Sequence, residues 1–276
     1  METEVAIPFA KYSGAGNDFI IIDARSEDFA EKLYDMVGPG GRKRLVKMLC
    51  RRGHSIGADG LLFIEPSNEA DFAWDFYNSD GSDADMCGNA ARCVARFCHS
   101  HSIAGPEMKF KTKAGIVKAK ILDGVRVEVM MLPPRLIEKD LPILVDSGVP
   151  HVVIRENKIN DTRKLREIAL TNRFPQKAGP RGANVTFFAP NGPGKINAIS
   201  FERGVEDFTL ACGTGAMAAA FVEKLLNPGE TAIEVRMPGG RLEVEFPPNQ
   251  NLVLLRGPAC KLSEGVFSKE ACHEEL

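Results

Sequence analysis

With 276 residues, the chain is long enough for one large domain or two of ordinary size, and it can bury a core without disulfides or structural metal. Its net charge of −2 excludes an overall basic field that would draw it to nucleic acid. Glu2, Glu4 and Pro8 break the basic-then-apolar pattern of a secretory signal, and the longest uncharged stretch, residues 208–222, is shorter than the roughly 20 residues that a membrane helix needs. The composition therefore predicts a cytoplasmic protein that binds neither nucleic acid nor membranes.

The hydrophobic pattern predicts more strands than helices. Continuous apolar runs and apolar–polar alternation mark strands, and apolar residues three or four positions apart mark helices. In chain order, these segments include a strand at 19–22, a helix at 42–51, strands at 61–64 and 125–130, helices at 89–101, 162–170 and 215–226, and a strand at 242–246. Because short turns separate many of the strands, we expect an α+β fold with largely antiparallel sheets.

The two halves of the chain repeat each other. Three landmarks recur in the same order: Gly16–Ile22 and Gly148–Ile154, Asn78 and Glu202, and Cys87 and Cys212. Their offsets are 148 − 16 = 132, 202 − 78 = 124 and 212 − 87 = 125. The repeat predicts two pseudo-symmetric domains, residues 1–132 with Cys87 and residues 133–262 with Cys212, divided near Pro133-Pro134. The tail at 263–276 is expected to return to the first domain.

Cys87 and Cys212 both stand where a loop is expected to become a helix. A helix N-terminus presents unpaired N–H groups and about half a positive charge, so it binds a carboxylate and lowers a thiol pKa from about 8.5 towards 3.5–7.5. If both corners face one amino acid, one thiolate can remove the α-proton and the opposite thiol can return a proton to the other face. This chemistry inverts the carbon and needs neither metal nor pyridoxal phosphate.

The other five cysteines lack this setting. Seven cysteines in a chain without a secretory signal indicate reduced thiols rather than a disulfide framework. We interpret the five as core or surface thiols: Cys50, Cys93, Cys98, Cys260 and Cys272. A Cys-Gly pair at one helix start is usually a packed small residue, so the functional interpretation depends on there being two such corners in the same repeat register.

The motifs resemble those of the diaminopimelate epimerase family. The resemblance runs from about residue 11 to 260 and includes Gly14-Ala15-Gly16-Asn17-Asp18-Phe19, Gly57-Ala58-Asp59-Gly60, the run from Asn78 to Cys87-Gly88-Asn89, and the run from Glu202-Arg203-Gly204 to Cys212-Gly213-Thr214-Gly215. It implies two similar domains, each a sheet wrapped round a central helix, with the active site in the cleft between them. It also implies a homodimer that interconverts LL- and meso-diaminopimelate for lysine and peptidoglycan synthesis, without a cofactor or metal.

The same resemblance assigns roles to individual residues. In the LL-to-meso direction, Cys87 matches the proton-donating thiol and Cys212 the proton-accepting one, with His151 and Glu202 tuning their ionisation. The residues expected to bind substrate are Asn17, Asn78, Gly88, Asn89, Asn184, Glu202, Arg203, Gly213 and Thr214. Taken on their own, His151 is also explained as a structural histidine and Glu202-Arg203 as a surface ion pair.

Two positions depart from the family pattern. Val149 stands where the family often has asparagine, and Gly60 where some relatives have glutamine. Valine cannot make a side-chain hydrogen bond to the far end of the substrate. The departures leave open a racemase or epimerase of another amino acid on the same scaffold.

Three other functions fit the sequence less well. A metal-binding module would use Cys93, Cys98, His99 and His101, but no complementary pair at finger-like spacing follows. A dithiol redox protein is disfavoured because the chain has no Cys-x-x-Cys. A dinucleotide site is disfavoured because Gly14-Ala15-Gly16 lacks the third glycine and precedes an expected strand.

Overall fold

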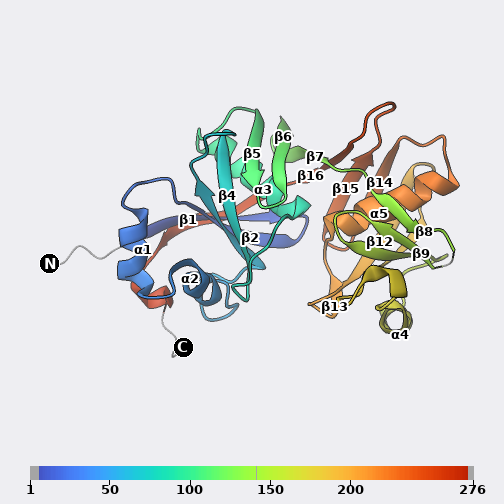
Figure 1. Cartoon of the computed structure of the whole chain (residues 1–276), viewed down its shortest axis with the longest axis horizontal. Coiled ribbons are helices and arrows are strands. Elements are labelled where there is room, and N and C mark those ends of the chain that lie inside the picture. The colour runs from blue at the N-terminus through green and yellow to red at the C-terminus, as the bar shows by residue number, and fades with distance from the viewer. Residues whose placement is uncertain (1–5, 141, 273–276) are drawn as a thin grey trace. The chain divides into compact units, whose positions relative to one another are not determined.

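The computed structural model describes residues 6–140 and 142–272, so the parts of the expected domains at 1–5, 141 and 273–276 lie outside the described residues. The chain divides into two compact units (Figure 1). Unit 1 comprises the chain up to Val127 together with the segment from Ala259 onwards, and unit 2 is Glu128–Pro258. The polypeptide therefore enters unit 2 once and returns to unit 1 once.

The chain forms five α-helices, two 3-10 turns and seventeen strands within the described residues. The helices are α1 (Phe29–Val37), α2 (Gly41–Leu49), α3 (Gly88–Ser100), α4 (Thr162–Asn172) and α5 (Gly213–Leu226), and the 3-10 turns are η1 (Gln176–Ala178) and η2 (Lys269–Cys272). The strands up to the division are β1 (Ile7–Gly14), β2 (Asn17–Asp23), β3 (Gly60–Glu65), β4 (Phe72–Asn78), β5 (Glu107–Thr112), β6 (Gly115–Asp123) and β7 (Arg126–Met131), which crosses it. The later strands are β8 (Arg135–Glu138), β9 (Ile143–Asp146), β10 (Pro150–Arg155), β11 (Asn184–Pro190), β12 (Lys195–Glu202), β13 (Asp207–Thr209), β14 (Ala232–Met237), β15 (Gly240–Glu245), β16 (Val253–Pro258) and β17 (Cys260–Phe267).

The internal repeat is confirmed by the strand pairing. In unit 1, β2 pairs with β3 in parallel, β3 with β4 antiparallel, β4 with β5 in parallel and β5 with β6 antiparallel. In unit 2, the series β10, β11, β12, β14 and β15 pairs in the same parallel and antiparallel order. The α3 helix follows β4 in the first series, and α5 follows β12 and the short β13 in the second.

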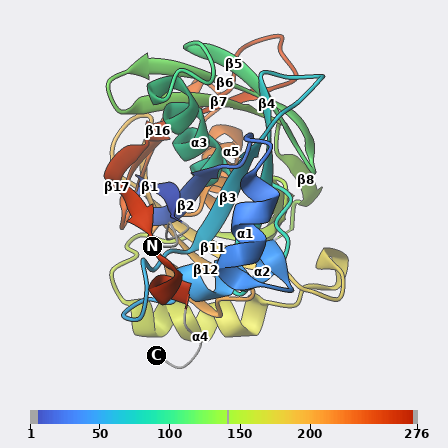
Figure 2. The ribbon, with the colours of Figure 1, turned by 90° about the vertical axis from the view of Figure 1, so that its left-hand side faces the viewer.

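Each unit has one central helix. In unit 1, α3 packs against β1, β2 and β6, and Figure 2 shows it running among the strands of that unit, where β17 lies beside β1. In unit 2, α5 packs against β10, β11, β12, β14 and β15. The buried faces are mostly small, with Ala90, Ala91 and Ala95 in α3 and Ala216–Ala220 in α5. Small side chains let the surrounding strands approach the helix closely, so each sheet can curve around it.

The predicted fold class is confirmed, and the structure adds elements to it. The helices expected at 42–51, 89–101, 162–170 and 215–226 appear as α2, α3, α4 and α5, with ends that differ by at most two residues. The α1 helix was not predicted, and it packs in the hydrophobic core of unit 1 beside α2. No helix among the described residues is long and apolar enough to span a membrane.

Candidate active site

Cys87 and Cys212 occupy the same local position in the two units, the residue that precedes the first turn of the central helix. Both have extended backbone angles, φ −147° and ψ 125° for Cys87 and φ −129° and ψ 109° for Cys212. The first hydrogen bonds inside the helices run from Ala91 N to Cys87 O and from Ala216 N to Cys212 O, each 2.9 Å. A helix N-terminus carries about half a positive charge, so each corner favours an anion.

A tight hairpin places Asn17 beside the first corner. Gly14 pairs with Asn17 across a two-residue turn in which Ala15 has φ 61° and Gly16 has φ 95°, the left-handed geometry of a short β-hairpin. A Cβ on Gly14 would lie 2.9 Å from Asn89 O, so only glycine lets β1 end against the start of α3. The hairpin therefore explains why this motif contains two glycines before its asparagine.

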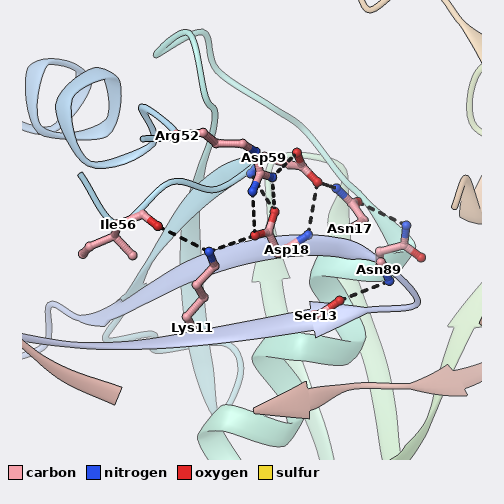
Figure 3. Close-up of polar contacts among 9 residues, drawn as sticks. Lys11, Ser13, Asn17, Asp18, Arg52, Ile56, Asp59 and Asn89 are labelled. Atoms are coloured by element: carbon pink, nitrogen blue, oxygen red, sulfur yellow. Dashed lines mark hydrogen bonds and ion pairs between the residues drawn. The ribbon is translucent and has the colours of Figure 1, made fainter. Parts of the chain in front are cut away.

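In unit 1, the amide of Asn17 meets both Cys87 and Asn89. Its Oδ1 accepts a hydrogen bond from Asn89 Nδ2 at 3.1 Å and from the Cys87 thiol at 3.8 Å. Its Nδ2 donates to Asp59 Oδ2 at 2.6 Å (Figure 3). The structure thus brings together three of the predicted substrate-binding or catalytic residues of this unit and adds Asp59 to them.

Two other predicted residues of unit 1 are placed differently. Gly88 is buried at the start of α3, and its carbonyl accepts from Arg92 Nη1 at 3.2 Å. Asn78 is exposed at the end of β4, and its Nδ2 donates to Ser82 Oγ at 3.0 Å. The hydrogen bond of Asn78 closes the turn that leads towards Cys87, so its contact in this structure is with that turn and not with the thiol.

In unit 2, Thr214 links Cys212 to His151. Cys212 is 5% exposed, and its Sγ accepts from Gly215 N at 3.4 Å and lies 3.4 Å from Thr214 Oγ1. The same Thr214 hydroxyl lies 2.9 Å from His151 Nε2. An N–H donated to sulfur stabilises the thiolate form of Cys212. The buried imidazole acts on this thiol through the threonine hydroxyl between them.

The partners of His151 determine its tautomer. Asn184 Oδ1 accepts from Arg203 N at 2.9 Å, which leaves the amide Nδ2 of Asn184 to donate to His151 Nε2 at 3.3 Å. Nε2 is therefore an acceptor, and the ring proton sits on Nδ1, which lies 2.9 Å from Thr186 Oγ1. Thr186 Oγ1 is in turn 2.9 Å from Ser200 Oγ. Neutral His151 is thus oriented by groups on both sides.

The same burial keeps His151 neutral, which makes the stability of the fold sensitive to acid. Burial, reinforced by the positive charge of Arg203, lowers the pKa of His151 to about 3. In the unfolded chain a histidine titrates near 6.5, so between these values the unfolded state binds the extra proton. We expect the free energy of unfolding to fall as pH drops from about 6.5 towards 3, by up to about 1.4 kcal/mol per pH unit from this group.

Denaturant titrations between pH 6.5 and 4.5 measure this effect in wild type and in His151→Gln. The substitution should flatten the pH dependence, because glutamine has no proton to gain. The matched control is His54→Gln, at an exposed position, which should leave the slope unchanged. An equal slope in wild type and His151→Gln would show that His151 is not the buried neutral group described above.

Glu202 and Arg203 lie at the end of β12, both half-buried. Glu202 Oε1 accepts from Thr209 Oγ1 on β13, and Arg203 Nη1 donates to Gly182 O at 3.1 Å. Burial lowers the pKa of Arg203, and the neighbouring Arg181 and Arg173 act in the same direction. Of the neighbouring charges, Arg173 is already paired with the Glu206 carboxylate, and Asp146 acts on the pKa of Arg203 in the opposite direction.

Sequence reasoning missed the buried hydroxyls behind His151. Thr186 and Ser200 are 0% exposed, and they lie on the neighbouring strands β11 and β12. A signal for Thr186 was present, because Asn184 and Thr186 are two residues apart in a strand and so share one face. The pairing of β11 with β12 brings Ser200 opposite Thr186, and no sequence spacing indicates that pairing.

Two further features bear on ligands of the site. Among the described residues, no group of three or more histidine, cysteine or acidic side chains is arranged to hold a metal ion. A Cβ on Gly60 would lie 2.7 Å from Tyr77 O, so the backbone here has no room for the glutamine that some relatives carry. The glycine of the second corner, Gly213, is buried and precedes Thr214 in the first turn of α5.

Comparison with known proteins identifies close relatives along the whole chain. The family model described as diaminopimelate epimerase matches residues 9–137 and 143–262. Diaminopimelate epimerase from Aquifex aeolicus is 37% identical over 280 residues, which cover 95% of this chain and 98% of the relative. The enzyme of the same name from Archaeoglobus fulgidus is 32% identical over 284 residues, covering 95% and 96%.

Solved structures show the same fold at low sequence identity. A hydroxyproline epimerase from Agrobacterium vitis has a TM-score of 0.68 at 16% identity, covering 97% of this chain and 94% of that one. A phenazine biosynthesis protein of the PhzF family from Bacillus anthracis has a TM-score of 0.67 at 15% identity, covering 95% and 99%. These likenesses establish the architecture and carry no statement about substrate.

Proposed function

The chain belongs to the diaminopimelate epimerase family, and we propose that it interconverts LL- and meso-2,6-diaminopimelate in the synthesis of lysine and peptidoglycan precursors. The observation that carries the proposal is the pair of thiols at the N-termini of α3 and α5. The family model matches residues 9–137 and 143–262, so Cys87 and Cys212 both lie within the matched part of the chain. The reaction is an isomerisation that the chain's own residues can perform.

The proposed proton transfer uses one thiol on each face of the α-carbon. In the LL-to-meso direction, Cys212 as a thiolate takes the α-proton, so the C–H bond breaks and an S–H bond forms. Cys87 as a thiol gives its proton to the opposite face, so a new C–H bond forms and the sulfur keeps the electron pair. Two thiols with opposite resting states give an acid and a base without any other group.

The first turns of α3 and α5 supply the electrostatic help that this step needs. Removing the α-proton builds negative charge on the carbon and on the α-carboxylate. We propose that the first turns of the two helices, with Gly88 and Asn89 in α3 and Gly213 and Thr214 in α5, bind that carboxylate, because a helix N-terminus carries about half a positive charge. Donors fixed by the fold before the reaction stabilise the developing charge without reorganising.

His151 acts in this proposal as a positioning residue for Cys212. Its neutral ring holds the Thr214 hydroxyl, and that hydroxyl lies 3.4 Å from the sulfur. Because burial keeps the pKa of His151 near 3, the ring brings no positive charge to the thiolate at neutral pH. Its influence on the ionisation of Cys212 therefore comes from hydrogen bonding.

Substrate selection in the proposal depends on the distal ammonium and carboxylate of diaminopimelate. Arg203 can pair with the distal carboxylate, since a guanidinium can bind a carboxylate through two parallel hydrogen bonds. Glu202 and the amides of Asn17, Asn78 and Asn184 supply acceptors and donors for the remaining polar groups. A site with such groups rejects a substrate that would leave them unpaired.

We also propose that the enzyme works as a cytoplasmic homodimer and needs no metal or cofactor. One face of β17 supports a dimer: Leu262 and Val266 are 54% and 59% exposed and lie on the same face of the strand. Exposed apolar side chains that share a face can be covered by another chain. Sedimentation of the purified protein would measure the assembly.

The reaction is tested with purified, reduced, metal-stripped protein and LL-diaminopimelate, followed by chiral chromatography, with other amino acids in parallel. We expect meso-diaminopimelate to form and the other amino acids to remain unchanged. Inversion of a different amino acid alone would support an epimerase of another substrate, which Val149 and Gly60 leave open. No inversion of any amino acid by folded protein with free thiols would refute the proposal.

A further inference from the structure

We propose that Asp59 is a positioning residue that fixes the amide of Asn17 so that its carbonyl oxygen, and not its NH₂ group, faces the Cys87 thiol. An asparagine amide has a donor end and an acceptor end, and its neighbours decide which end points where. The inference rests on the proposed function for its kinetic consequence only. The contacts that carry it lie entirely in unit 1, and Figure 3 draws those of Asn17 with Asp59 and with Asn89.

The donor end of Asn17 is fixed by Asp59. A carboxylate only accepts hydrogen bonds, so the atom 2.6 Å from Asp59 Oδ2 must be Asn17 Nδ2. The same Asp59 oxygen accepts the backbone N–H of Asp18 at 3.1 Å. Asp59 therefore holds both the side chain of Asn17 and the backbone next to it.

The acceptor end of Asn17 has a second contact, from the side of α3. Arg92 Nη2 donates to Asn89 Oδ1 at 2.7 Å, and a guanidinium only donates, so the other end of the Asn89 amide is its Nδ2. That Nδ2 donates to Asn17 Oδ1 at 3.1 Å. The Asp59 carboxylate at one end and the Arg92 guanidinium at the other thus determine where the oxygen and the nitrogen of the Asn17 and Asn89 amides lie.

The orientation of the Asn17 amide determines which of its atoms faces the Cys87 thiol. The thiol of Cys87 donates to Asn17 Oδ1 at 3.8 Å. A protonated sulfur has a proton to offer to that oxygen, whereas a thiolate would face the negative end of a carbonyl dipole. The orientation of Asn17 therefore favours the protonated form of Cys87, the form that must donate in the LL-to-meso direction. The Cys212 sulfur differs from Cys87 in that it accepts the N–H of Gly215, besides lying 3.4 Å from the Thr214 hydroxyl.

Asp59 is itself held by a network of charges. Arg52 Nη2 donates to Asp59 Oδ1 at 2.8 Å, and the same guanidinium bonds to Asp18 through both of its terminal nitrogens. Lys11 Nζ lies 3.0 Å from Asp18 Oδ2, and Asp59 N donates to Asp18 Oδ1 at 3.2 Å. Figure 3 shows these side chains gathered at the end of the hairpin that carries Asn17. The side chain of Asp59 is 42% exposed, so replacing it should leave the core of unit 1 intact.

Two substitutions of Asp59 separate positioning from charge. Asp59→Ala and Asp59→Asn both remove the negative charge, but only asparagine keeps an oxygen that can accept from Asn17 Nδ2. We expect Asp59→Asn to retain kcat/KM within about threefold, and Asp59→Ala to lose about 10- to 100-fold, mainly in kcat, because the proton donor is no longer held in register. The matched control is Asp28→Ala, which removes an exposed carboxylate paired with Lys32 and should leave activity unchanged.

The second readout is the rate at which iodoacetamide alkylates Cys87 in the absence of substrate, measured as a function of pH. Peptide mapping quantifies the alkylation of this cysteine. The charged and titratable groups around this thiol include Arg92 and Cys93 on α3 and, beyond Asn17, the pair of Asp59 and Arg52. Once Asp59 is alanine, only the hydrogen bond from Asn89 Nδ2 still opposes a turn of the Asn17 amide, so its N–H groups can face the sulfur more often than in Asp59→Asn and stabilise a thiolate. The midpoint for Asp59→Ala should therefore lie at lower pH than that for Asp59→Asn.

Equal midpoints and equal kcat/KM in the two variants would overturn the proposal, because only charge or general damage would then be at work. Unchanged melting temperature and unchanged alkylation of Cys212 check that each variant is folded. If Asp59→Ala does not fold, Asp59→Ser takes its place, since its shorter side chain leaves Asn17 Nδ2 out of reach. If wild type fails to invert diaminopimelate, the proposed function is wrong, but the alkylation comparison still decides the role of Asp59.

Discussion

Replacing Cys87 or Cys212 with alanine is expected to lower kcat/KM on the order of 10³- to 10⁴-fold in both directions of the reaction. Each variant lacks either the group that takes the α-proton or the group that returns it, and alanine can do neither. The loss should be equal in the two directions, because an enzyme cannot change the equilibrium between the LL and meso forms. Initial rates with the LL and the meso substrate give kcat/KM of both variants in both directions.

The matched control for these variants is Cys260→Ala. Cys260 is half-buried at the start of β17 and is not at a helix N-terminus, so its loss should leave kcat/KM within about twofold of wild type. Either active-site variant turning over at the wild-type rate would eliminate its thiol as acid or base. Equal losses in all three variants would indicate general damage rather than the removal of catalytic groups.

Gly215→Ala is expected to destabilise unit 2 and to reduce activity strongly. Alanine normally favours a helix over glycine, yet a Cβ here would lie 2.2 Å from Ser200 Oγ and 3.0 Å from Thr186 Oγ1. Because both hydroxyls are buried behind His151, the helix or the strands must shift, at a cost of about 1–3 kcal/mol in the free energy of unfolding. A shift of this kind moves the Cys212 sulfur that Gly215 N contacts, so we expect kcat/KM to fall about 100-fold.

Denaturant unfolding and epimerisation assays on Gly215→Ala measure the two effects together. Gly229→Ala is the matched control, since a Cβ there would meet no atom within 4 Å. The double variant Gly215→Ala with Ser200→Ala removes the closest obstacle and should recover part of the stability. A single variant as stable and as active as wild type would contradict the close approach of α5 to β12 on which the geometry at Cys212 depends.

The cysteine corners could be predicted from the sequence because their signals are local. The repeat offset pairs Cys87 with Cys212, and small residues follow each one, as the first turn of a buried helix requires. The structure places both at the start of the central helix. The two halves differ at the third residue after each cysteine, which is Ala90 in α3 and Gly215 in α5. Only Gly215 has strand hydroxyls so close that a Cβ would collide with them, and this difference between the halves was not predicted.

The parts of the fold and site that escaped prediction depend on long-range contacts. The α1 helix has the apolar spacing of Phe29, Leu33 and Met36, but it is short and precedes a glycine-rich turn, so its pattern was not interpreted as a helix. Asp59 lies in the motif Gly57-Ala58-Asp59-Gly60, to which the sequence assigns no role for this aspartate. Its contact with Asn17 joins residues 42 positions apart, and no local pattern indicates such a contact. Buried polar groups satisfied by a distant strand leave no periodic signal in the sequence.

The measurement that tests the central claim most directly is the fate of the α-hydrogen of LL-diaminopimelate in D₂O during the first few per cent of reaction. With one thiol on each face, Cys87 enters the reaction carrying solvent deuterium, so the meso product should contain deuterium at the inverted carbon while the remaining LL substrate keeps its protium. Proton NMR and mass spectrometry read both species from one sample. Early deuterium in the recovered LL substrate, or substrate protium carried into the meso product, would show that a single base serves both faces and would contradict the account.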